Sequence, residues 1–288
     1  MNTRRAQQGG AAVNGDSASN ESDPGVAAPG HLPDGFRVAL DPGVRWAGDG
    51  SLLVGGSPIR LLRLTPAGRR VIDRLVAGEP VPPSAAAQKL TRRLLDAGLA
   101  HPRPPDPAAP TAVAIVIPVR NDPEGVTATL AALAPDRRAA DESAHTAPGS
   151  TVVVDDLSLD PGPVAAACWR GGAALIRRTA WGGPGAARND GWRATDEPLV
   201  AFLDANCEPE PGWADEILPH FADPQVAAVA PRIVPAIEPA APGWLAAYEA
   251  VSSPLDLGAR DAIVRPRSPV AYVPTAALVV RRDAVEEL

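Results

Sequence analysis

The fold is decided by the stretch Val113-Ala-Ile-Val-Ile-Pro-Val-Arg-Asn-Asp122, in which an unbroken apolar run ends in polar side chains. Short runs rich in β-branched residues, without polar alternation, are typical of strands that are buried on both faces. Helix-length stretches separate it from three further runs of this kind: Val152-Val-Val154, Ala173-Ala-Leu-Ile176 and Leu199-Val-Ala-Phe-Leu203. The sequence therefore predicts an α/β fold in which helices cover a mostly parallel sheet.

Polar side chains follow three of these runs closely. The three groups are Arg120-Asn-Asp122, Asp155-Asp156 and Asp204-Ala-Asn206. In an open α/β sheet, ligands bind beside the carboxyl ends of the strands. We therefore expect the three groups to converge on one functional site.

The adjacent carboxylates Asp155 and Asp156 admit two interpretations. At the end of a buried strand, an unpaired carboxylate costs several kcal/mol unless it faces solvent, a ligand or a cation. One of them could instead cap a helix that begins near Pro161. Asp204 has the same ambiguity, and together with Asn206 it offers hard oxygen ligands to a cation.

A glycine-rich turn, Trp181-Gly-Gly-Pro-Gly-Ala-Ala-Arg188, runs into a predicted helix. Free N–H groups and the macrodipole at such a helix start favour a phosphate, and Arg188 could neutralise it. A plain turn between a strand and a helix is the simpler alternative. The turn also imitates a dinucleotide-binding fingerprint, but Arg188 stands where that fingerprint has a small residue, and Asp155 and Asp156 remain unexplained.

Taken together, four motifs resemble those of nucleotide-sugar glycosyltransferases of the GT-A fold, in the large inverting family two. The motifs are Ile115-Val-Ile-Pro-Val-Arg-Asn-Asp122, Val152-Val-Val-Asp-Asp156, Gly183-Pro-Gly-Ala-Ala-Arg-Asn189 and Phe202-Leu-Asp-Ala-Asn206. The resemblance implies a site for a nucleotide sugar, with the acceptor side at Thr275 and Ala276. The implied nucleotide-sugar residues are Pro118, Arg120, Asp122, Asp155, Asp156, Arg188 and Asp204.

The resemblance also implies a divalent cation, Mg²⁺ or Mn²⁺, held by Asp204 and residue 206. Here that second position is Asn206, whose amide oxygen can bind a metal but brings no charge, so we expect weakened metal binding. Leu157 stands where the family usually has glycine.

A general base is expected from the resemblance in a Glu-Asp pair, some tens of residues beyond Thr275-Ala-Ala277 and after a Gly-Gly-Phe-Asp stretch. The chain reaches Leu288 before either motif. We therefore expect a chain truncated at its C-terminus, whose catalytic base lies beyond Leu288. Glu286 and Glu287 are interpreted as solvated charges on an exposed helix that begins near Asp283.

Other segments resemble a narrower group of these enzymes that glycosylates a peptide-derived redox-cofactor precursor. Among them are Leu32-Pro-Asp-Gly-Phe36, Gly55-Gly-Ser-Pro58 and Val229-Ala-Pro-Arg-Ile-Val234. This resemblance implies UDP-glucose as donor, that precursor as acceptor, and elongation of a β-linked oligoglucan. The alternative function is a non-catalytic module that binds a nucleotide sugar or a peptide.

Three regions are predicted along the chain: a disordered tail over 1–30, a small winged-helix-like α+β domain over 31–104, and the glycosyltransferase domain over 105–288. The small domain shows strand-like pieces near 36–40 and 51–54, a helix that opens at Thr65-Pro66, and a helix over 84–95. It could be a stabilising cap on the sheet. It also resembles peptide-recognition domains, which bind an extended leader peptide as an added strand.

Composition excludes several classes of protein. The 288 residues carry a net charge of −7, so general nucleic-acid binding is disfavoured. No run is long enough for a membrane span, and the start lacks a secretory signal. Two cysteines, Cys168 and Cys207, make neither a disulfide framework nor a zinc site. We expect a cytoplasmic protein, with association at the cytoplasmic face of the membrane left open for a full-length form.

Overall fold

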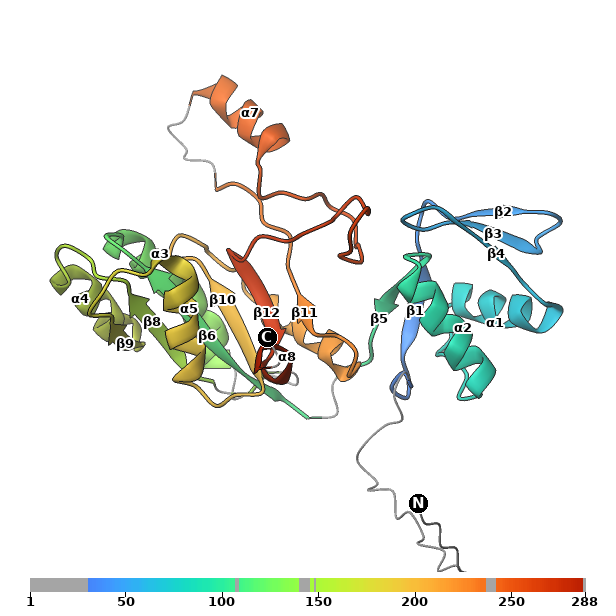
Figure 1. Ribbon diagram of the computed structural model, residues 1–288, viewed down its shortest axis with the longest axis horizontal. Coiled ribbons are helices and arrows are strands. Elements are labelled where there is room, and N and C mark those ends of the chain that lie inside the picture. The colour runs from blue at the N-terminus through green and yellow to red at the C-terminus, as the bar shows by residue number, and fades with distance from the viewer. Residues whose placement is uncertain (1–30, 107–108, 140–145, 148, 237–241, 287–288) are drawn as a thin grey trace, which may run out of the picture.

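The computed structural model describes residues 31–106, 109–139, 146–147, 149–236 and 242–286. Its described part forms two units with separate hydrophobic cores, which we call the N-terminal unit (32–103) and the C-terminal unit (111–286) (Figure 1). The predicted tail over 1–30 and Glu287 lie outside the described residues.

A seven-stranded sheet forms the centre of the C-terminal unit. Its main strand order is β11-β12-β10-β6-β8-β9, and β7 pairs with β6 in addition. The four predicted runs form parallel neighbours in this sheet, which confirms the predicted fold class. They are β6 (Thr111–Val119), β8 (Thr151–Asp155), β9 (Ala174–Arg177) and β10 (Leu199–Leu203).

The remaining strands of this sheet were not predicted; β7 and β11 have only two residues each, and β12 was missed although its five residues are mostly apolar. β12 (Ala277–Arg281) runs antiparallel to β10, and β11 (Ala228–Val229) runs antiparallel to β12. β7 (Thr146–Ala147) is parallel to the start of β6. The antiparallel β12 gives this otherwise parallel sheet a mixed edge.

Helices cover both faces of the sheet, as the apolar runs require. Odd-numbered β6 residues such as Ile117 pack against α3 (Pro123–Ala139) and α4 (Gly162–Gly171), and even-numbered ones such as Val116 pack against α5 (Gly183–Arg193). Helix α5 lies so close to the sheet that a Cβ at Gly191 would come within 2.3 Å of Val116.

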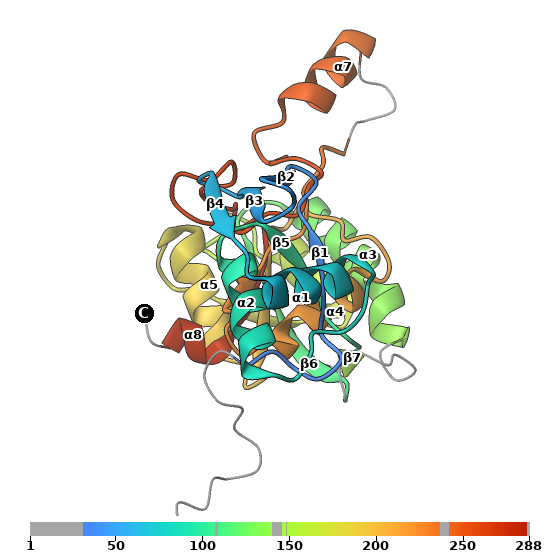
Figure 2. The same ribbon diagram turned by 90° about the vertical axis from the view of Figure 1, so that its right-hand side faces the viewer.

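Smaller helical elements complete the C-terminal unit. They are α6 (Trp213–Ile217), a 3₁₀ helix η1 (Leu218–Ala222), α7 (Gly243–Ser252) and α8 (Arg282–Glu286). Helix α7 projects away from the body of the protein (Figures 1 and 2). None of the helices within the described ranges combines the length and the apolar character needed to cross a lipid bilayer.

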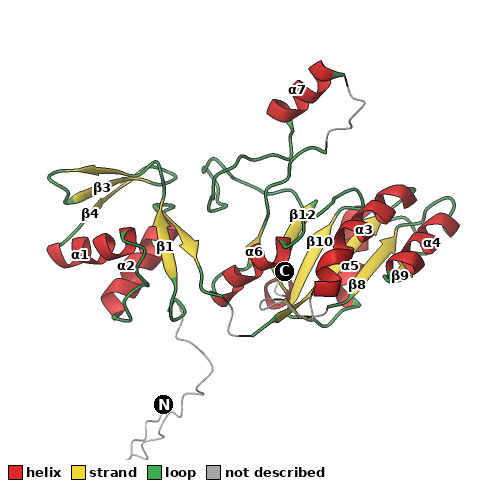
Figure 3. Cartoon of the chain, turned by 180° about the vertical axis from the view of Figure 1, so that it is seen from behind, coloured by secondary structure: helices red, strands yellow, loops and turns green. Residues whose placement is uncertain are grey.

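The N-terminal unit contains two small sheets and two helices (Figure 3). β1 (Arg37–Leu40) pairs with β5 (Ala100–Arg103), and β2 (Arg45–Ala47), β3 (Leu52–Gly55) and β4 (Arg60–Arg63) form an antiparallel meander. The two helices are α1 (Pro66–Val76) and α2 (Ala85–Asp96).

Both helices begin where the sequence predicts. The Thr65 hydroxyl accepts from Gly68 N at the start of α1, and the Ser84 hydroxyl accepts from Ala87 N at the start of α2. Of the strands, β1 and β3 were expected, whereas β2, β4 and β5 were not. β2 and β4 carry exposed arginines, which hide the apolar alternation of a half-buried strand. β5 contains Pro102, a residue that is uncommon within strands.

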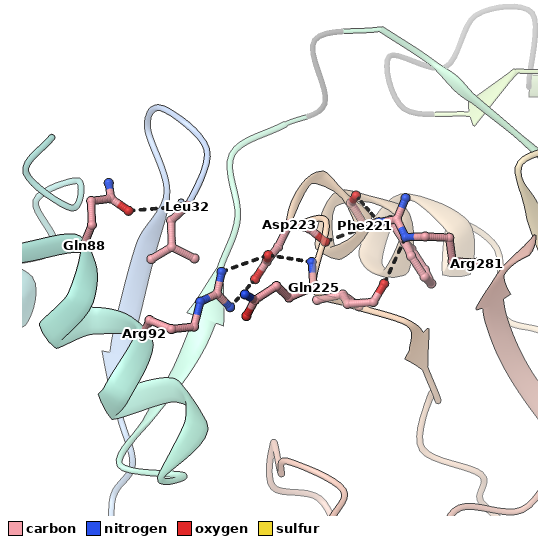
Figure 4. Close-up of polar contacts among 8 residues, drawn as sticks. Leu32, Gln88, Arg92, Phe221, Asp223, Gln225 and Arg281 are labelled. Carbon is pink, nitrogen blue, oxygen red and sulfur yellow. Dashed lines mark hydrogen bonds and ion pairs between the residues drawn. The ribbon is translucent and has the colours of Figure 1, made fainter. Parts of the chain in front are cut away.

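A buried ion pair joins the two units. Arg92 of α2 donates through Nη1 and Nη2 to the two carboxylate oxygens of Asp223, at 2.7 and 2.9 Å (Figure 4). The Asp223 side chain is only 4% exposed. From β12, Arg281 donates to the carbonyl oxygens of Phe221 and Asp223, so the pair is anchored to the edge of the main sheet.

Replacing Asp223 with alanine should lower the free energy of unfolding by about 3 kcal/mol, because Arg92 would stay largely buried without its counter-charge. The matched control is Asp73→Ala, which removes an exposed pair with Arg69 and should cost about 0.5 kcal/mol. Urea denaturation followed by circular dichroism compares the two variants. Equal losses would contradict a special role for the buried pair.

Candidate functional site

The three polar groups predicted from the sequence meet at one edge of the sheet. Their strands β10, β6 and β8 are parallel neighbours, so their carboxyl ends lie side by side. Two hydrogen bonds lock the loops after β6 and β8 together: Asn121 N donates to Ser158 Oγ, and Leu159 N donates to Asn121 Oδ1, both at 2.8 Å. We call the side chains gathered at this edge the strand-end cluster: Arg120, Asn121, Asp122, Asp155, Asp156, Asp204 and Asn206, with Arg188 paired to Asp204.

Two residues in these loops adopt a left-handed backbone. Asn121 has a φ of 56° and Leu157 a φ of 62°. Asparagine tolerates this region, whereas leucine is disfavoured there and glycine is preferred. The left-handed backbone explains why a glycine is expected at position 157. The strained Leu157 is held in place because its neighbours Asp155 and Ser158 are fixed by hydrogen bonds to Arg177 and Asn121 and to each other.

Asp155 is fully buried and is satisfied by protein groups. Its carboxylate accepts from Ser158 N at 2.8 Å and from Nη1 of Arg177 at 2.6 Å. Arg177 comes from the end of β9 and also donates to the Ser158 carbonyl oxygen. The carboxylate therefore ties the loop after β8 to the neighbouring strand.

Asp156 caps a helix, but a different one from the helix expected. Its carboxylate accepts from Gly182 N at 3.0 Å and from Gly183 N at 2.7 Å, at the start of α5. At the helix after Pro161, α4, the first amide, Gly162 N, donates instead to Oδ1 of Asp160 at 3.0 Å. The prediction that the amides of the glycine-rich turn are free for a phosphate is therefore wrong for these two residues, because Asp156 already neutralises that helix end.

Arg178 completes the network around Asp156 and was missed by the sequence analysis. It donates to Asp156 and, through Nε, to Asp190 of α5 at 2.7 Å. Arg177 and Arg178 directly follow the apolar run that forms β9, so the same rule that selected Asp155 and Asp156 would have selected them. Burial by itself raises the pKa of Asp156, but the hydrogen bonds from Arg178 and the two amides outweigh it and lower that pKa.

Arg188 and Asp204 form an ion pair across the cluster. Nη2 of Arg188 lies 2.6 Å from Oδ1 of Asp204, which brings together α5 and the end of β10. The Arg188 side chain is 14% exposed and that of Asp204 is 38% exposed, so the carboxylate faces outward. The buried Nε of Arg188 has no hydrogen-bond partner among the described residues.

The other residues predicted for the site differ in how exposed they are and in which groups they contact. Asp204 N donates to the Ala276 carbonyl oxygen at 2.8 Å, which places the acceptor-side segment against the end of β10, with Thr275 exposed beside it. Pro118 is buried in β6 opposite Val154. Asp122 accepts from Gly125 N at the start of α3, so its carboxylate already serves as a local cap.

An exposed arginine and an exposed tryptophan meet at the rim of the cluster. The Arg120 guanidinium lies 5.6 Å from the centre of the Trp181 ring. The Trp181 side chain is 64% exposed, in the turn that precedes α5. A cation–π contact of this kind leaves the outer face of the indole available to a planar ligand.

The chain offers few ligands for a metal ion. Within the described ranges, no three His, Cys, Asp or Glu side chains converge on a common point. Asp204 and the exposed Asn206 supply one carboxylate and one amide oxygen, which suits Mg²⁺ or Mn²⁺ if substrate phosphates complete the shell. Burial, and then the charge of Asp204, raise the pKa of the neighbouring Cys207 thiol, whose Sγ donates to the Ala276 carbonyl oxygen.

Two hollows lie away from the strand-end cluster. One of about 500 Å³ lies between α3 and α4, with Leu130 and Ala167 among its lining residues. Its lining is mainly aliphatic, with Arg170 as its charged group. The strand-end cluster is identified by its converging charges.

The lowered pKa of Asp156 gives a pH-dependent test of the network. The ionised carboxylate contributes stability that is present above its ordinary pKa of 3.8 and is lost as the pH falls through the lower folded value. Asp156→Asn should therefore be less stable than the unmodified chain at pH ~6, by about 2 kcal/mol, and the difference should shrink near pH ~3.

Denaturant titrations at the two pH values measure this difference, with the exposed Asp34→Asn as control. A difference that does not depend on pH would show that the Asp156 charge does not stabilise the fold.

Comparison with known proteins supplies close sequence relatives. The chain is 43% identical over 263 residues to the proteins named "Pre-mycofactocin glycosyltransferase" of Mycobacterium tuberculosis strains H37Rv and CDC 1551. This match covers 89% of the chain and 51% of each relative, so the chain spans about half the length of these curated relatives.

Solved structures resemble the chain more distantly. The mannosyltransferase PcManGT from Pyrobaculum calidifontis, in complex with GDP-Man and Mn²⁺, is 19% identical, with a TM-score of 0.44 over 64% of this chain and 48% of that one. Staphylococcus aureus TarS 1–349, in complex with UDP, is 15% identical, with a TM-score of 0.45 over 61% and 48%.

A family model covers the C-terminal unit. The model of "Glycosyl transferase family 2" matches residues 114–288, which include all the strand ends of the cluster. This match extends over more than half of the chain and agrees with the family that the four sequence motifs resemble. The chain belongs to glycosyl transferase family 2.

Proposed function

We propose that the strand-end cluster binds UDP-glucose, and that the protein transfers its glucose with inversion to a mycofactocin precursor and then elongates a β-linked oligoglucan. Membership of glycosyl transferase family 2 supports the reaction class. The name of the 43% identical relatives supports the acceptor. The donor sugar, the inversion and the glucan follow from the resemblance of the sequence motifs.

The observation that carries the donor site is the Arg188–Asp204 pair at the junction of three strand ends. A departing nucleoside diphosphate gains negative charge, and fixed positive charge beside it lowers the barrier. The Arg188 guanidinium can exchange the Asp204 carboxylate for a phosphate oxygen. That exchange would free Asp204 to bind a divalent cation together with Asn206, and such a cation would further stabilise the diphosphate.

The other residues of the cluster would enclose the nucleoside. Asp155 and Asp156 are buried and held by Arg177 and Arg178, so they would act by fixing the loop after β8 as a rigid wall on one side. Pro118, Arg120 and Asp122 follow on the neighbouring strand end, and the exposed Trp181 ring beside Arg120 offers a surface for stacking.

The competing function is a module that binds a nucleotide sugar or a peptide without turning it over. Asn206 favours this non-catalytic module, because one missing carboxylate weakens the binding of the cation that transfer needs. Release of UDP from UDP-glucose in the presence of the acceptor separates the two functions when it is measured on a form of the protein that carries the base expected beyond Leu288. For either one we propose a cytoplasmic location, and we leave association with the cytoplasmic membrane face as part of the same proposal.

The first test of the donor site is the dependence of UDP binding on a cation. Calorimetry should show UDP affinity about tenfold higher with Mn²⁺ than with chelator, and Asp204→Asn should remove the gain because the charged ligand is lost. The exposed Asp196→Asn, at the opposite end of β10, serves as control. Equal affinity of the unmodified chain with chelator and with Mn²⁺ would overturn this assignment.

A gain-of-function variant tests the role of residue 206. Asn206→Asp adds a carboxylate beside Asp204, so Mn²⁺ should bind about tenfold more tightly in the presence of UDP. Titration of Mn²⁺ into the UDP-saturated variant measures the change. An unchanged metal affinity would show that Asn206 is not a ligand.

A further inference from the structure

Helix α7 carries an apolar face that lies exposed in the described part of the chain. Trp244, Tyr248 and Val251 are exposed at 73%, 58% and 83%. Successive helix residues are turned by about 100°, so these three side chains and Leu245 form one stripe with Tyr248 at its centre. Glu249, the only charged residue of α7, lies at the flank of this stripe.

The structure holds α7 out as an arm from the body of the C-terminal unit (Figures 1 and 2). The segment that carries it, residues 230–276, leaves the main sheet after β11 and returns to it at β12. Near its start, Arg232 donates through Nε and Nη2 to the two carboxylate oxygens of Asp256, at 2.9 and 2.7 Å. This ion pair ties together the chain on both sides of α7 and fixes the base of the arm.

The hollow between α3 and α4, which we call the α3–α4 groove, has a character that complements α7. Its volume is about 500 Å³, and Leu130, Ala131 and Ala134 of α3 and Ala167 of α4 are among its lining residues. Small side chains on both walls let a further helix approach closely, because the distance between packed helices depends on the side chains at their contact. Arg170 is the charged residue of this lining.

The two surfaces also match in charge. Among the residues that the structure describes, no carboxylate forms an ion pair with Arg170, and no basic side chain forms one with Glu249. Each surface is otherwise mainly apolar and presents one charge, positive in the groove and negative on the helix. A charge pair at the flank of a docked helix would fix the direction in which that helix lies.

We propose that α7 of one copy of this chain docks into the α3–α4 groove of a second copy, with Glu249 beside Arg170. The Arg232–Asp256 pair holds the arm away from its own groove, so the second copy supplies the partner (Figure 1). Both copies carry both surfaces. Two reciprocal contacts therefore close a symmetric dimer and cover both apolar faces.

A lipid surface fits the apolar face of α7 less well. A helix that lies in a membrane interface typically carries lysine or arginine on its polar face, and α7 has neither. The net charge of −7 also opposes binding to anionic lipids. A lipid would, in addition, leave the α3–α4 groove without an occupant.

Sedimentation equilibrium of the whole chain measures the proposed dimer. Tyr248→Ala should raise its dissociation constant at least roughly tenfold, because this change removes the centre of the docked face. The control Tyr272→Ala removes an exposed tyrosine from the same segment but outside α7, and should change the constant less than about twofold. A chain that stays monomeric at ~100 µM would overturn the proposal, as would equal losses in both variants.

A charge exchange tests which surfaces meet. Arg170→Glu and Glu249→Arg should each weaken the dimer at least roughly tenfold, because each places two like charges side by side at both contacts. The control Arg70→Glu, on the exposed side of α1, lies outside both surfaces and should change the dissociation constant less than about twofold.

Mixing the two single variants distinguishes docking between copies from docking within one copy. In the mixed dimer each contact again joins opposite charges, so the affinity should return to within about threefold of the unmodified chain. An arm that docks into its own groove would gain nothing from mixing. Absence of recovery in the mixture would therefore overturn the proposal.

Co-sedimentation with vesicles of phosphatidylcholine and phosphatidylglycerol tests the lipid alternative. We expect no binding to vesicles that depends on Tyr248, because the dimer buries that side chain. Vesicle binding by a monomeric chain that is lost in Tyr248→Ala would overturn the second copy as the partner.

Discussion

The carboxylate of Asp156 is the group on which the arrangement of the candidate site depends. Asp156 directly follows β8, and its carboxylate accepts hydrogen bonds from two backbone amides at the start of α5 and from Arg178. A buried carboxylate requires such partners, and an uncapped helix start requires an acceptor. One contact meets both requirements and fixes the position of α5 over the sheet. Arg188 lies on that helix, so its pairing with Asp204 follows from the same contact.

Close packing reinforces this position. Gly191 allows α5 to approach Val116 of β6 more closely than any side chain would permit. Ala187 and Trp192 of the same helix fill the core on this face of the sheet. Arg188 therefore lies on a helix that is held in place both at its start and in its middle, and such rigid support is what a binding site for a charged ligand needs.

The two units are joined by charge rather than by a shared core. Arg92 and Asp223 form the buried link, and Arg281 connects that link to β12. An exposed pair between Arg103 and Asp261 adds a second connection through the segment 253–276. The segment that supplies Ala276 to the strand-end cluster thus also contacts the N-terminal unit.

Sequence alone determined the four parallel strands of the central sheet and the edge at which their polar ends meet. Uninterrupted β-branched runs can be stable only as strands buried on both faces, and in parallel strands their polar ends must share one edge. The helix starts at Thr65 and Ser84 could also be predicted from the sequence, because capping is a local interaction. The sequence also carried the family motifs, including the missing second acid at Asn206.

Tertiary structure decided which partners these groups find. Asp156 could have capped the helix that follows it in sequence, but the fold places the start of α5 closer, and the glycine-rich turn is consequently bound by protein instead of standing open. The pairing of Arg188 with Asp204 and of Arg92 with Asp223 joins residues that are distant in the sequence, at separations of 16 and 131 positions. Charge pairing of this kind leaves no periodic signal in a sequence, because it depends only on where the packed elements bring the side chains together.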